Sequence, residues 1–142
     1  MIVKFREQNT EYLDLTPNQY YVVIGIEADD FRILNDAGRP FLYDASLFEV
    51  VDSKEPDDWV TEIGEDGERY AYPLPLNSVG FFEDFFDEKK DAVVTFWRVV
   101  NHQLAAASET VVFGGDTKIL HARIGRRICP GFGVVQIRIK VF

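Results

Sequence analysis

The chain has 142 residues and a formal net charge of −9 at pH 7, enough length for one domain with a sizeable core. Hydrophobic residues make up 46% of it, so its composition indicates a folded domain and excludes a wholly disordered one. Affinity for nucleic acid comes largely from Lys and Arg, so the negative charge disfavours nucleic acid as a partner and favours a basic protein.

Three features of the sequence indicate a cytoplasmic protein. Cys129 is the only cysteine, which excludes an intrachain disulfide and fits a reducing compartment. No segment approaches the roughly twenty apolar residues that a membrane span requires. The N-terminal residues lack the length and the cleavage site of a signal peptide. We therefore expect a cytoplasmic protein with no membrane partner.

The first third of the chain reads as a series of short strands. Within residues 1–6, Val3 and Phe5 alternate with the charged Lys4 and Arg6, which predicts a short strand. Leu13 and Leu15 also alternate with polar neighbours and predict a further short strand. Residues 20–26 form a continuous β-branched and aromatic run, typical of a strand that is covered on both faces, and Gly25 predicts a bulge or bend within it.

A hairpin and a helical turn follow. Residues 31–34 and 39–43 predict two strands, and the Asn-Asp-Ala-Gly sequence at 35–38 predicts a tight turn between them. Asp44 can cap one helical turn, after which residues 47–51 predict the next strand.

This order of elements, over residues 19–52, resembles the closing half of an SH3-like small β-barrel. The resemblance implies an antiparallel, partly closed sheet. The Trp and the aromatic-acidic segment with which SH3 domains bind proline-rich peptides have no counterpart in this chain. The resemblance therefore implies a shape and not that kind of ligand binding.

An acidic segment follows the resemblance. Residues 52–91 contain 13 Asp and Glu against 4 Lys and Arg, a net charge of −9. Within this segment, residues 59–63 and 68–72 predict two strands, with a Gly-Glu-Asp-Gly turn at 64–67 between them. Two prolines, Pro73 and Pro75, end the second strand. The segment thus predicts an acidic β-hairpin.

Residues 78–107 predict a helical layer. Ser78 can cap a short helix that carries four phenylalanines between residues 81 and 86. A longer amphipathic helix follows, because apolar side chains recur at intervals of three and four residues. This apolar face consists of Val93, Phe96, Trp97, Val100 and Leu104.

The last part of the chain has a different charge. Residues 110–142 contain 6 Lys and Arg against one acid, a net charge of +5, and residues 134–142 alternate as a strand with one buried face. We expect an α+β domain over residues 1–142, with a β-rich core and acidic hairpin (1–75), a helical segment (78–107) and a basic C-terminal β-hairpin (110–142).

No catalytic or metal-binding pattern emerges from the sequence. Cys129 with His102 or His121 could form a nucleophile and base in space, but their spacing gives no support for it. Paired Cys and His ligands, a calcium loop and a phosphate-binding loop are all missing. We expect no cofactor, no bound metal and no enzymatic activity.

The remaining candidate is a partner-binding surface on the acidic hairpin, where aromatic side chains alternate with carboxylates. Aromatic anchors within a charged rim suit rapid binding of a basic protein, although these aromatics could instead pack into the core. The candidate residues are Asp57, Asp58, Trp59, Glu62, Glu65, Asp66, Glu68, Tyr70 and Tyr72.

The function that this surface suggests is non-enzymatic protein binding, such as that of an immunity or antitoxin protein that neutralises a basic toxin, for example a nuclease. One alternative is a ligand-binding or enzymatic domain with a pocket between helix and sheet, lined by Trp97 and the phenylalanines. A second alternative is a subunit-interaction module in which the acidic part meets a basic tail.

Overall fold

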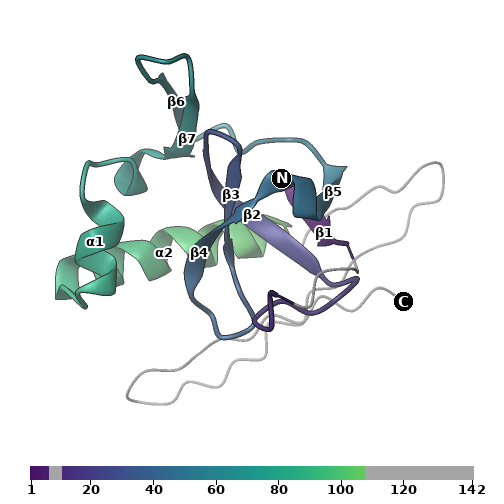
Figure 1. The fold of residues 1–142 in the computed structure, drawn as a ribbon. Coiled ribbons are helices and arrows are strands. Elements are labelled where there is room, and N and C mark those ends of the chain that lie inside the picture. The colour runs from purple at the N-terminus through teal and green to yellow at the C-terminus, as the bar shows by residue number, and fades with distance from the viewer. Residues whose placement is uncertain (7–10, 108–142) are drawn as a thin grey trace.

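The computed structural model describes residues 1–6 and 11–107 (Figure 1). The predicted C-terminal β-hairpin at 110–142, together with His121 and Cys129, lies outside the described residues. Within them, the chain forms an antiparallel sheet and two helices, which confirms the expected α+β class. None of the described helices is both long and apolar enough to cross a membrane.

The predicted strands of the first third are confirmed. They are β1 (Ile2–Phe5), β2 (Tyr20–Glu27), β3 (Asp30–Leu34), β4 (Pro40–Asp44) and β5 (Phe48–Asp52). The predicted helical turn is the 3₁₀ helix η1 (Ala45–Leu47), and the Asp44 carboxylate caps it by accepting a hydrogen bond from the Ser46 backbone N–H at 2.8 Å.

The strands are hydrogen-bonded in the order β4-β3-β2-β1-β5, and every pair is antiparallel. The sheet is open within the described residues. The expectation of a partly closed sheet is therefore wrong for this part of the chain. The physical reason is that β4 and β5 lie at the two ends of the strand order, and no hydrogen-bonded pair joins them within the described residues.

The strand predicted around Leu13 and Leu15 is wrong, because this segment consists of turns. Leu15 is buried in the core while Leu13 is 91% exposed. The Asp14 carboxylate between them accepts hydrogen bonds from the Tyr43 hydroxyl at 2.5 Å and from the Asn35 side chain at 2.9 Å. These side-chain bonds hold the segment in place without strand pairing.

Strand β2 is covered on both faces, as its apolar run predicted. Val23 lies in one core cluster and Ile24 in another. The pairing of β2 with β3 shifts register between Val23 and Gly25, which confirms the predicted bulge.

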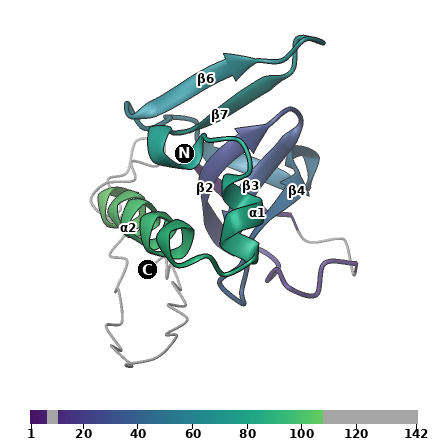
Figure 2. The ribbon, with the colours of Figure 1, turned by 90° about the vertical axis from the view of Figure 1, so that its left-hand side faces the viewer.

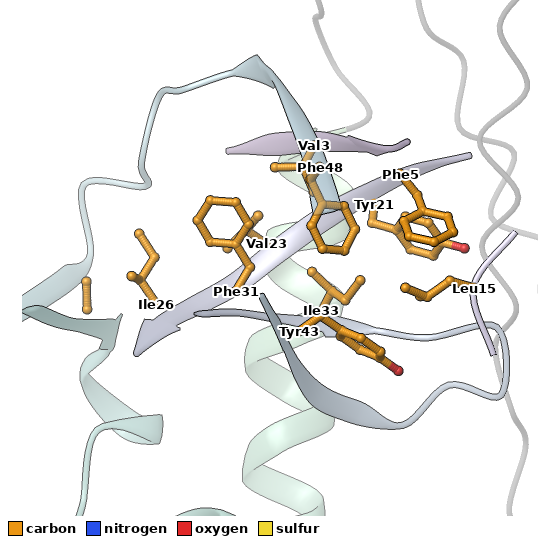
Figure 3. Packing of buried hydrophobic residues seen from close by; sticks show 11 residues of the cluster. Val3, Phe5, Leu15, Tyr21, Val23, Ile26, Phe31, Ile33, Tyr43 and Phe48 are labelled. Carbon is orange, nitrogen blue, oxygen red and sulfur yellow. The ribbon is translucent and has the colours of Figure 1, made fainter. Parts of the chain in front are cut away.

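The two clusters lie on opposite faces of the sheet. The first joins residues of β1 to β5, β7 and the 11–18 segment, and Figure 3 shows Phe48, Phe5 and Tyr21 packed together above Ile33 and Tyr43. In the second, Ile24, Tyr72 and Leu76 pack against residues of the two helices.

The acidic hairpin forms as predicted, from β6 (Trp59–Ile63) and β7 (Arg69–Pro73). β7 pairs with β2 at two positions only, Ala71 opposite Ile26 and Tyr70 opposite Glu27. The turn of the hairpin at 64–67 and the strand ends that it joins extend beyond the end of β2, and Figures 1 and 2 both show the hairpin projecting from the body of the protein.

The helical layer consists of the 3₁₀ helix η2 (Leu74–Leu76), α1 (Phe81–Phe86) and α2 (Lys90–Ala107). The predicted cap at Ser78 is wrong: the residue that precedes α1 is Gly80, in the left-handed conformation with φ of 79°. On α2, Phe96, Val100 and Leu104 are buried as predicted.

Candidate functional site

Six of the nine candidate residues expose a carboxylate on the hairpin or on the loop before it. The loop carries Asp57 and Asp58, β6 carries Glu62, and the turn and its end carry Glu65, Asp66 and Glu68; all six are exposed. The structure therefore brings the acidic candidates together on one projecting element.

The cation of the hairpin is neutralised locally. Arg69 is the only Lys or Arg between residues 59 and 73. Its guanidinium donates two hydrogen bonds to the Glu55 carboxylate, at 2.8 and 2.6 Å. These bonds hold the pKa of Glu55 below its ordinary value. Because this pair cancels itself, the exposed acids determine the sign of the field around the hairpin.

The three aromatic candidates do not lie together at the surface. Trp59 is half-buried and packs against the first core cluster, and its indole N–H is buried without a hydrogen-bond partner. Tyr70 is half-buried, and its hydroxyl donates to Glu68 at 2.9 Å. Tyr72 is only 4% exposed and belongs to the second cluster. The alternative that the aromatics pack into the core holds for Tyr72, and Trp59 also packs against the core. Tyr70 is therefore the aromatic residue that we keep in the proposed surface.

Tyr72 instead completes a buried polar network with Glu27 and Arg32. Its hydroxyl donates to Glu27 Oε1 at 2.5 Å and accepts a hydrogen bond from Arg32 Nε at 2.6 Å. Arg32 also donates to Glu27 Oε1 at 2.7 Å. Burial raises the pKa of Tyr72 well above its ordinary value, so the hydroxyl stays protonated.

Arg32 is only 7% exposed, and each of its three guanidinium nitrogens donates a hydrogen bond. Besides the bonds to Glu27 and Tyr72, it donates to the Pro40 carbonyl oxygen at 2.8 Å. Its guanidinium carbon lies 3.7 Å from the centre of the Phe82 ring, which adds a cation–π contact.

A groove of about 270 Å³ opens beside this network. One side is formed by Glu62, Tyr70 and Tyr72 of the β6–β7 hairpin. The other side is formed by residues 76–83, which lead from η2 into α1, and Glu27 and Arg32 lie in the groove between them. Three carboxylates and one guanidinium therefore line it, which makes the groove acidic.

Other candidate chemistry is not assembled among the described residues. No group of three or more His, Cys, Asp or Glu side chains in residues 1–6 and 11–107 could hold a metal ion. His102 is exposed on α2. Trp97 packs against Phe96 with ring centres 5.1 Å apart and does not line the groove, unlike Phe81 and Phe82.

Of the groove lining, the nine candidate residues include only Glu62, Tyr70 and Tyr72. The charged lining residues that the sequence interpretation missed are Glu27, Arg32 and Glu83. One signal was present: Arg32 interrupts an otherwise apolar strand, and an arginine at a buried strand position needs a paired carboxylate. The sequence alone does not identify Glu27 as that partner.

Comparisons with known proteins identify no relative. No protein-family model matches the chain, and neither a curated protein nor a solved structure matches it.

Proposed function

We propose that this chain is a non-enzymatic module that binds a basic protein through the acidic β6–β7 hairpin and the loop before it. The partner of this proposal is a basic toxin such as a nuclease, which the chain neutralises in the cytoplasm as an immunity protein does. A nuclease presents cations to its substrate, and an acidic surface competes for the same cations.

The exposed carboxylates on the projecting hairpin carry this proposal. Six acids stand on this element and its preceding loop, and the one guanidinium among the hairpin residues is paired with Glu55. Unneutralised charges on a projecting element speed the encounter with an oppositely charged partner. Tyr70, half-buried between the acids, adds an aromatic contact of the kind that contributes affinity.

We also propose an SH3-like core as the scaffold for this hairpin. The pairing of β1 with both β2 and β5, and the 3₁₀ turn between β4 and β5, support this proposal. The scaffold contributes rigidity here and not ligand binding, since fold does not establish function.

The test begins with capture of the partner from the source cells by the tagged chain. A charge-reversed variant, Asp57→Lys, Asp58→Lys, Glu65→Lys and Asp66→Lys, should lose the partner. A control reverses four exposed acids elsewhere and should retain it. The control changes are Asp29→Lys, Glu49→Lys, Asp87→Lys and Glu88→Lys.

The captured protein is then measured directly. It should be basic, and its association rate should fall about tenfold or more between low and high salt, because exposed charges are screened beyond roughly 10 Å at 0.1 M. If it is a nuclease, the chain should inhibit it. Equal capture by both variants, or an association rate that does not respond to salt, contradicts the proposal.

A further inference from the structure

We infer that the groove between the β6–β7 hairpin and α1 binds the side chain of an arginine on the basic partner. This inference rests on the proposed function and names a contact within it. It also gives a function to the network of Glu27, Arg32 and Tyr72. Binding through the exposed hairpin acids alone would not need this network.

The charge of the groove selects a cation. Glu27, Glu62 and Glu83 line it from β2, β6 and α1. Arg32 is the opposing charge, and its guanidinium already donates to Glu27, to the Tyr72 hydroxyl and to the Pro40 carbonyl. Glu62 and Glu83 remain uncompensated by any cation of the groove lining, so the groove retains a negative charge.

The walls of the groove favour a planar cation. Tyr70, Tyr72 and Phe82 line it with aromatic rings. Phe82 already contacts one guanidinium, that of Arg32, at 3.7 Å. A guanidinium stacks on aromatic rings and pairs with carboxylates in the same plane, whereas an ammonium is more strongly hydrated. Arginine therefore fits the lining better than lysine.

The size and rim of the groove suit a single side chain of a protein partner. Sites for drug-sized ligands occupy roughly 300–1,000 Å³, and the groove occupies about 270 Å³. Val79 lies at its rim, fully exposed, and Leu74 on the adjoining turn is 67% exposed. These apolar side chains can contact the backbone around an inserted arginine, as at the edge of a protein interface.

The experiment titrates the ¹⁵N-labelled full chain with the peptide Ac-Gly-Arg-Gly-NH₂ and follows backbone amide shifts. Shifts should cluster at Tyr70, Val79 and Glu83. The peptide with citrulline in place of arginine, which has nearly the same shape without the charge, should cause no such shifts. Shifts that cluster elsewhere, or equal shifts with citrulline, overturn the inference; equal affinity for the lysine peptide overturns the choice of a guanidinium.

Two variants locate the site. Glu62→Gln with Glu83→Gln should weaken peptide binding about tenfold or more, because the arginine loses its charge-assisted hydrogen bonds to both carboxylates. The matched control, Glu49→Gln with Asp87→Gln, removes the same charge from exposed positions outside the groove and should bind as the original chain does. Equal affinities of the two variants overturn the inference.

The same variants separate this inference from the proposed function. If the captured partner requires the hairpin acids but binds the Glu62→Gln, Glu83→Gln variant unchanged, the groove inference fails and the proposed function stands. If the arginine peptide binds in the groove but capture does not depend on the hairpin acids, the docking surface fails and the arginine site stands.

Discussion

Gly25 has no room for a Cβ atom. It lies in β2 directly beneath Tyr72. A Cβ built at Gly25 lies 1.9 Å from Tyr72 Cε1 and 2.2 Å from Cδ1, and real Cβ atoms essentially never approach closer than 3.0 Å. Gly25→Ala therefore forces the Tyr72 ring out of its place.

The network around Tyr72 sets the cost of this movement. The ring must move by more than 1 Å to reach 3.0 Å from the new Cβ. Its hydroxyl is held by Glu27 and Arg32 at 2.5 and 2.6 Å, so the movement breaks these bonds. Overpacking costs about 1–3 kcal/mol, and loss of a hydrogen bond to a charged group about 1.5–3 kcal/mol. We expect Gly25→Ala to lower the free energy of unfolding by about 2.5–6 kcal/mol, the sum of these two costs.

Urea denaturation measures this change, and two further variants show its cause. Gly64→Ala, in the turn of the β6–β7 hairpin, is the matched control, because its Cβ would lie 3.3 Å from the half-exposed Tyr70 ring, which can move away. It should cost less than about 1 kcal/mol. In a Tyr72→Ala background the ring that clashes is absent, so Gly25→Ala should not lower the free energy of unfolding. It should raise it by up to about 0.4–1 kcal/mol, because alanine restricts the unfolded chain. An undiminished cost in that background refutes the reasoning.

Two pH-dependent predictions follow from the tyrosines and from Glu55. Burial raises the pKa of Tyr43 and of Tyr72 in the folded protein above the pKa of about 10 that a tyrosine has in the unfolded chain. The free energy of unfolding is therefore unaffected by these tyrosines below about pH 10 and falls as the pH rises above it. Urea midpoints should fall above pH 10, and Tyr43→Phe should make this fall shallower. The pKa of Glu55 is lowered by Arg69, so Glu55→Gln should cost up to about 1 kcal/mol at pH 7. The difference in stability between the original chain and this variant should vanish as the pH falls through the pKa of Glu55 in the folded protein, which lies below the ordinary glutamate value of about 4.3.

The features that the sequence predicted well depend on residues close together in the chain. The turn at 35–38 is set by its own Asn and Gly: Asn35 Oδ1 accepts hydrogen bonds from the backbone N–H groups of Ala37 and Arg39, and Gly38 has a φ of 72°. The cap at Asp44 is equally local. Such interactions need no knowledge of the rest of the fold.

One wrong prediction concerns a place where distant residues determine the structure, and another fails for a local reason. Leu13 and Leu15 have the alternation of a strand, but Asp14 is bound by Asn35 and Tyr43, more than twenty residues away. A serine three residues before Phe81 is a common capping pattern, yet the chain takes the left-handed conformation at Gly80. Neither the periodicity of the sequence nor a capping pattern predicts the hydrogen bonds of Asp14 or the conformation at Gly80.

The candidate site was predictable for its acids and not for its aromatics. Carboxylates stay exposed unless they are paired with a cation, so the number of Asp and Glu residues in the segment was enough to predict an acidic surface. Tyr70 and Tyr72 share a face by the two-residue period of a strand, and their different burial depends on where β2 ends. Tyr72 lies over Gly25 within β2, whereas Tyr70 pairs with Glu27, the last residue of that strand.

The end of β2 also determines how the acidic hairpin is held. Two residue pairs and one further backbone hydrogen bond, from the Ala28 N–H to the Arg69 carbonyl oxygen at 2.8 Å, join β7 to the end of β2. This short stretch of backbone contact fixes the hairpin weakly by itself. The side chain of Tyr72, seated where Gly25 leaves room and bonded to Glu27 and Arg32, adds the contacts that those two pairs do not supply. Because this network also lines the groove, a displaced Tyr72 would alter the direction of the acidic hairpin and the shape of the groove together.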